Sequence, residues 1–208
     1  MSETNELIRS STMLATIGMM DSAEATESLT AILNGFQMEA SGASGVVDKL
    51  LKVDLIAATS SEELATSLRY VSSMAKNAGI TLDQMIGIIA VGSETTRTSA
   101  ETIGNAWKSI LTRMQQVKAG VDVDDMGKPL NNVEKVLTKY GIALRDTTGD
   151  FRDIGEVIDE VGNKWKDFDG VQQRQIATAM AGKVFARTYS NIWVYIPEFP
   201  YIGKNLTI

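Results

Sequence analysis

The feature that most constrains the fold is a recurring helix-start signal. A Ser, Thr or Asp three residues before a Glu or Gln has the spacing of a capping box, in which each side chain hydrogen-bonds the other residue's backbone. The signal appears at Asp21/Glu24, Ser60/Glu63, Thr81/Gln84, Thr98/Glu101, Asp153/Glu156 and Asp169/Gln172. Because each match opens a run of helical apolar spacing, the sequence predicts an all-α chain.

Apolar residues recur along most of the chain at the three- and four-residue spacing of an amphipathic helix. The longest stripe comprises Ile103, Trp107, Ile110, Leu111, Met114 and Val117, and a later one comprises Ile154, Val157, Ile158, Val161 and Trp165. Since Trp107 and Trp165 each continue an aliphatic stripe, we expect both to be buried. Helix–Gly–helix units recur, but the letters show no fixed period of the kind that marks a solenoid.

Three segments break the helical pattern. Residues 120–128 are acidic and bounded by glycine, which is typical of an exposed loop. Residues 142–151 place short apolar pieces around a turn at residues 146–149, which predicts a small β-hairpin. In residues 189–208, Pro197 and Pro200 forbid a continuing helix. The expected fold is therefore a multi-helix array or bundle, with one small β-hairpin near 142–151 and a non-helical C-terminal tail whose aromatic side chains are exposed or only partly covered.

The chain contains no histidine and no cysteine. Histidine is the commonest general base near neutral pH, cysteine supplies the thiolate nucleophile, and both are usual ligands of zinc, haem and iron–sulfur clusters. The sequence therefore predicts no catalytic residue, no cofactor-binding residue, no cofactor and no metal ligand. We expect that the protein is not an enzyme.

Two groups of acidic residues are the nearest approach to a chemical site. They are Asp122, Asp124 and Asp125, and Asp153, Glu156, Asp159 and Glu160. The first group lacks calcium-loop spacing, because counting from Asp122 places Val133 where an EF-hand has its twelfth-position Glu. The second group could supply paired carboxylates, but its helix buries Ile154 and Val157, which turns the acids outward. A solvated loop and a solvated helix face are the favoured interpretations.

The charge distribution argues against nucleic acid as a partner. Arg97, Lys108, Arg113 and Lys118 give one predicted helix a basic side, without interleaved aromatic residues and in a chain of net charge −6. Residues 42–45 lack the Lys-Ser/Thr of a phosphate-binding loop and are interpreted as a helix break. No stretch approaches the ~20 apolar residues of a transmembrane helix.

Ten methionines raise the question of an adaptable binding surface. Met85, Met114 and Met180 occupy core-facing helical positions, so we expect them to fill gaps in the core. The other cluster, Met13, Met19 and Met20, lies near the N-terminus and is a candidate exposed patch.

An ordered series of segments resembles the core of phage tail tape measure proteins. The segments are SSEELA from Ser60, AKNAGITLD from Ala75, SETTRTSAETIGNAWKSILTRM from Ser93, YGIALRDTTGDFRD from Tyr140, and QIATAMAG from Gln175 after Trp165. The upstream segments DSAEAT from Asp21 and FQMEAS from Phe36 are similar too. About nine tenths of the chain is covered, and the order of the segments is more specific than any one of them.

The resemblance implies a structural role without an active site. Tape measure proteins occupy the lumen of the tail tube, set tail length, and leave with the DNA at infection. Partners would be tail tube and tail assembly proteins, or other copies of the chain, and the location would be the virion tail and, during assembly, the host bacterial cytoplasm. A free-standing helical binding module, derived from a prophage tape measure gene and contacting a host factor, is the alternative.

Two departures from the family limit the resemblance. Family members are usually much longer, and even one unbroken helix of this chain would span only ~300 Å. After Gly182 the composition changes, as in a frameshifted or truncated prophage copy. The expected organisation is an N-terminal helical segment at 1–59, a tape-measure-core-like domain at 60–188, and an aromatic, Pro-bearing tail at 189–208.

Overall fold

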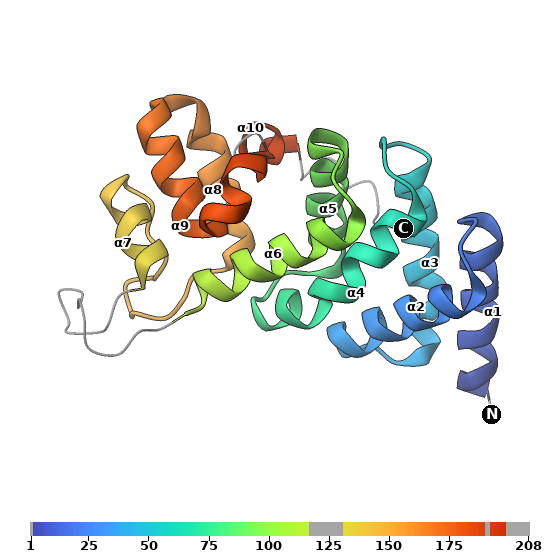
Figure 1. The fold of residues 1–208 in the computed structure, drawn as a ribbon. Helices are drawn as coiled ribbons and strands as arrows, with labels where there is room; N and C mark the ends of the chain where they lie inside the picture. The colour runs from blue at the N-terminus through green and yellow to red at the C-terminus, as the bar shows by residue number, and fades with distance from the viewer. Residues whose placement is uncertain (1, 117–130, 190–191, 199–208) are drawn as a thin grey trace. The chain divides into compact units, whose positions relative to one another are not determined.

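The computed structural model describes residues 2–116, 131–189 and 192–198, and these residues are mostly helical (Figure 1). The α-helices are α1 (Ser2–Ile17), α2 (Ser22–Phe36), α3 (Ala43–Asp54), α4 (Ser61–Asn77), α5 (Leu82–Thr96), α6 (Ala100–Met114), α7 (Asn132–Lys139), α8 (Ile154–Lys164), α9 (Gly170–Tyr189) and α10 (Ile192–Tyr195), with 3₁₀ turns η1 (Ala40–Gly42), η2 (Trp165–Asp167) and η3 (Ile196–Glu198). The prediction of a helical fold is confirmed. The expected acidic loop at 120–128 lies outside the described residues.

Side-chain caps fix the first turns of the helices. The capping boxes expected at Ser60 and Thr81 are complete, with both reciprocal hydrogen bonds present. The start expected at Thr98 is wrong by one residue, because Ser99 Oγ accepts the hydrogen bond from the Thr102 amide at 3.4 Å. Helix α6 accordingly begins at Ala100.

The chain folds into two compact units, and the boundary between them lies inside α6. Unit 1 extends to Asn105, and unit 2 spans Ala106–Pro197. The domain boundaries expected from the sequence, after residues 59 and 188, stay predictions.

The backbone of the first half repeats itself at an offset of 60 residues. Helices α2 and α5 have the same length, and their first residues are 60 positions apart. The turns around them also match, since Met19 and Gly79 have left-handed φ angles of 53° and 77°, and Gln37 and Arg97 have 57° and 52°. The first module (residues 2–54) and the second module (residues 61–114) therefore share the order of three helices and the turns that bound the middle one. The sequence shows no fixed period that indicates a solenoid, and this offset of 60 residues appears in the helix bounds and turn angles.

Within unit 1, close packing joins the first module to α4. A Cβ atom at Gly35 of α2 would lie 2.4 Å from the Ser72 Cβ of α4, so a larger residue at position 35 would force the two helices apart. Arg69 Nη1 of α4 also pairs with Glu27 Oε2 of α2 at 3.1 Å. The core beneath is aliphatic and includes Leu29, Ile32, Leu64 and Leu68, all fully buried.

Three tryptophans form the centre of unit 2. The ring of Trp193 lies 6.1 Å from that of Trp107 and 5.8 Å from that of Trp165, measured between centroids. All three side chains are buried, which confirms the expectation for Trp107 and Trp165. Gly162 of α8 allows Ile196 to approach, because a Cβ at position 162 would lie 2.4 Å from the Ile196 Cγ2.

The predicted β-hairpin at 142–151 is wrong. The segment contains a single antiparallel bridge, between Arg145 and Phe151, and no strand forms within the described ranges. Asp146 closes the turn by accepting hydrogen bonds from the backbone amide and hydroxyl of Thr148. The preceding residues Ile142 and Leu144 are both buried, so this segment is a connector anchored to the helical core and is too short for a ladder.

The predicted non-helical tail is also wrong over the described part of 189–208, and of its aromatic side chains Tyr195 is 43% exposed whereas Trp193 is buried. Residues 192–195 form α10, which ends before Pro197, and the 3₁₀ turn η3 at residues 196–198 contains Pro197. Ile192, Trp193 and Ile196 are fully buried. The sequence argument failed because a helix of four residues fits before Pro197, and because its partners Trp107 and Trp165 are distant in sequence.

Candidate interaction surfaces

Acidic residues of α8 cap the helix and form ion pairs. Asp153 caps the helix by accepting a hydrogen bond from the Glu156 amide at 3.0 Å. Glu160 pairs with Arg152 at 2.9 Å and with Lys164 at 2.8 Å. Burial raises the pKa of Glu160, but hydrogen bonds from Lys164 and Arg152 outweigh it and the net pKa is lowered. Burial, followed by repulsion from Asp153 and Glu156, raises the pKa of Asp159.

The other candidate site residues do not converge on a centre. Asp122, Asp124, Asp125 and Lys118 lie outside the described residues, and in the described ranges no cluster of acidic residues is arranged to hold a metal ion. Arg97 donates to the Ala58 carbonyl at 3.2 Å, and Lys108 is exposed on α6. The Arg113 guanidinium lies against Gly182. Residues 42–45 lead from η1 straight into α3.

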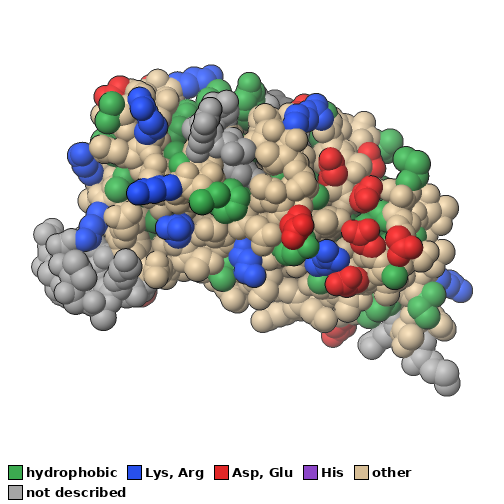
Figure 2. All heavy atoms as spheres, in the orientation of Figure 1, with side chains coloured by type: hydrophobic (Ala, Val, Ile, Leu, Met, Phe, Trp, Pro, Cys, Tyr) green, Lys and Arg blue, Asp and Glu red, His purple; other side chains and the backbone are tan. Residues whose placement is uncertain are grey.

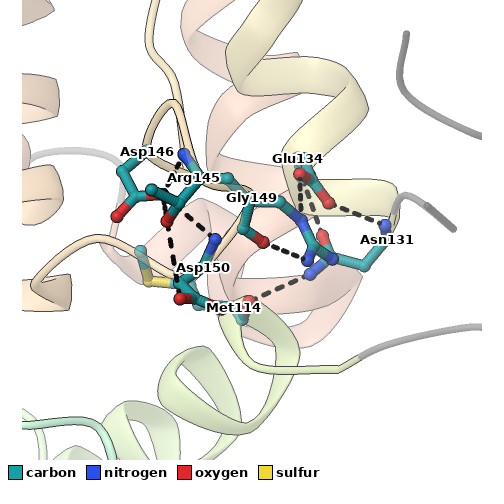
Figure 3. Close-up of polar contacts among 8 residues, drawn as sticks. Met114, Asn131, Glu134, Arg145, Asp146, Gly149 and Asp150 are labelled. Atoms are coloured by element: carbon teal, nitrogen blue, oxygen red, sulfur yellow. Dashed lines mark hydrogen bonds and ion pairs between the residues drawn. The ribbon is translucent and has the colours of Figure 1, made fainter. Parts of the chain in front are cut away.

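A buried polar network joins three segments of unit 2 (Figure 3). Arg145 Nε donates to Glu134 Oε1 at 2.7 Å, and Arg145 Nη1 donates to the Gly149 carbonyl at 3.0 Å. The two side chains are only 14% and 4% exposed. Asn131 caps α7 in a capping box with Glu134 and donates to the Met114 carbonyl at 2.9 Å. This network holds α7 and the 145–150 turn on the end of α6.

One end of unit 1 exposes four large aliphatic side chains. Ile17, Met19, Leu55 and Ile56 are 54%, 89%, 85% and 61% exposed, and we call them the apolar end. Ile17 and Met19 flank Gly18, and a Cβ at Gly18 would lie 2.8 Å from the Ser61 Oγ. Leu55 follows Asp54, whose carboxylate accepts from the Ser61 amide at 2.9 Å. Both pairs therefore border the first residue of α4.

The methionines lie where the sequence predicts, except for Met20. Met85, Met114 and Met180 are fully buried in the core. Near the N-terminus, Met13 is 39% exposed and Met19 belongs to the apolar end, whereas Met20 is buried. Of the expected patch, only Met19 belongs to the apolar end, whose members Leu55 and Ile56 had no sequence signal beyond their aliphatic type.

Unit 2 has a groove between α7 and α9, with a volume of about 420 Å³. Val136 of α7 and Val171, Thr178 and Ala179 of α9 line it, together with Arg174. Val171 is 60% exposed, so the apolar wall of the groove is open to solvent.

The two halves of the sequence differ in charge. Residues 1–105 carry thirteen acidic and six basic residues, whereas residues 106–208 carry thirteen acidic and fourteen basic residues. Figure 2 shows Asp and Glu side chains gathered over α2–α4 of unit 1, and Lys and Arg side chains over α7–α9 of unit 2. The first half therefore carries a net charge of −7 and the second half +1, which together give −6.

A known protein family matches most of this chain. The model of the phage-related minor tail protein family matches residues 1–182. The chain belongs to this family. Phage-related minor tail proteins have structural roles in the phage tail and are not known as enzymes, so protein partners in the virion tail follow from membership. No solved structure matches this minor tail protein. None of its described helices is long and apolar enough to cross a membrane.

Proposed function

We propose that the chain is the core region of a tail tape measure protein, which lies in the lumen of the tail tube, sets tail length and leaves with the DNA. The ordered segments from Ser60 to Gly182 carry this finer assignment within the minor tail family. The assignment gains support from the match of the family model over residues 1–182.

The repeated three-helix module fits a measuring role. A chain built from similar modules is extended by adding modules, each of which contacts mainly its neighbours. The modules at 2–54 and 61–114 show this kind of repetition. Such an architecture suits a protein that measures length, because its length can change by whole modules while the fold of each module stays the same.

Purified tails provide the test. Peptides from residues 2–116 are expected in mass spectra of intact tails, protected from added protease, and absent from tails after DNA ejection. Protease must digest a surface tail protein in the same sample as a control. Absence of the chain from intact tails, or its retention after ejection, would contradict the proposal.

A further inference from the structure

The apolar end is not required by the fold, because the second module lacks it. Sixty residues after Ile17, Met19, Leu55 and Ile56 stand Asn77, Gly79, Gln115 and Gln116. The same turn and the same helix end are therefore built with polar or small side chains in the second module. Four aliphatic side chains that are more than half exposed contribute little to the core of unit 1, and an exposed apolar patch of this kind marks a contact surface.

Met19 strengthens this interpretation. It has a left-handed backbone with φ 53°, which is strained for a residue with a side chain, whereas Gly79 occupies the equivalent position without strain. Because the Met19 side chain is almost fully exposed, no internal contact offsets the strain. A contact with another molecule would offset it.

The groove between α7 and α9 matches the apolar end in apolar character and complements it in charge. Its wall is apolar at Val136, Val171 and Ala179. Among the described side chains of α7 and α9, four are basic, and the acidic residue of these helices, Glu134, is buried against Arg145. Asp21, Asp54 and Glu62 border the apolar end in the sequence, together with the basic Lys52. An aliphatic surface with mainly acidic neighbours therefore matches an aliphatic groove with basic neighbours.

We propose that copies of this chain associate head to tail, with the apolar end of one copy seated in the α7–α9 groove of the next. The contact joins two different surfaces, so every copy in an array keeps one free surface of each kind. Opposite charges at the two surfaces set the orientation and disfavour pairing of like surfaces.

Sedimentation of the full chain tests the proposal through paired variants. Leu55→Glu and Val171→Glu each place a charge on one surface, and each is expected to weaken association by about thirtyfold or more. Mixing the two variants is expected to restore a one-to-one dimer and nothing larger, because each supplies the surface that the other lacks. Val184→Glu, at a residue of α9 that is 80% exposed and does not line the groove, should associate like the parent chain.

A second pair separates association from folding. Met19→Gly and Gln37→Gly both relieve a left-handed residue, so both are expected to raise the thermal midpoint. Only Met19→Gly should weaken association. The proposal is overturned by a parent chain that stays monomeric up to ~1 mM, by association that survives Val171→Glu, or by a variant mixture that fails to form the dimer.

Discussion

At the residue scale, the buried ion pair between Glu134 and Arg145 is the most consequential polar contact. Glu134→Gln keeps a side chain that can complete the α7 capping box but leaves the Arg145 guanidinium buried without its counter-charge. Breaking such a pair from one side costs about 3 kcal/mol. Urea unfolding followed by tryptophan fluorescence measures this cost within unit 2, because all three tryptophans lie there.

Glu160→Gln is the matched control for that measurement. Its two ion pairs, with Arg152 and Lys164, are partly exposed, so the loss should stay below ~1 kcal/mol. Equal losses for Glu134→Gln and Glu160→Gln would show that the 134–145 pair is not a special anchor.

Asp159 gives a pH-dependent prediction. Burial and the neighbouring acids raise its pKa in the folded state, so ionising it opposes folding. Its effect is absent at pH values below the ordinary carboxyl range, and stability is lost as the pH rises through the raised pKa. Asp159→Asn is therefore expected to raise the thermal midpoint at pH 7 and to leave it unchanged at strongly acidic pH. A gain of the same size for the exposed Asp167→Asn, or a gain that persists in acid, would contradict the assignment.

At the element scale, α10 is an integral part of unit 2. Trp193→Ala removes a fully buried ring that contacts Trp107 and Trp165, and such truncations cost about 3–5 kcal/mol. Tyr195→Ala lies on the same short helix with its side chain 43% exposed, and it should cost less than ~1 kcal/mol. Circular dichroism during thermal unfolding measures both variants. A Trp193→Ala protein as stable as Tyr195→Ala would mean that the tail is dispensable.

The sequence predicts correctly those features that depend on residues close together in the chain. Ser60 and Thr81 show their helix starts within four residues, and Trp107 shows its burial through its own stripe. The wrong predictions concern residues whose partners are distant in the sequence, or a choice between two adjacent residues. Trp193 is buried beside Trp107 and Trp165, which are distant in the sequence. Ser99, adjacent to Thr98, is the residue that caps α6. The Asn131/Glu134 box could have been found by admitting Asn as a capping residue.

At the scale of the whole molecule, the repeat was hidden because the backbone repeats and the letters mostly do not. Arg9 and Arg69, or Leu51 and Leu111, are identical at the 60-residue offset, but many other pairs, such as Phe36 and Thr96, differ even in polarity. The repeat therefore lies in the helix lengths and the turn angles. The apolar end could not be predicted from the sequence for the same reason. Leu55 stands out only when the repeat is known, because the equivalent residue of the second module is Gln115.

Tail length in electron micrographs tests the central claim most directly. In the phage that encodes this chain, in-frame duplication of residues 1–60 adds one module, and in-frame deletion removes one. A tape measure predicts tails that lengthen with the duplication and shorten with the deletion, each by at most ~90 Å for 60 residues at helical rise. Tails of unchanged length in both strains, with the altered chain present, would contradict the account.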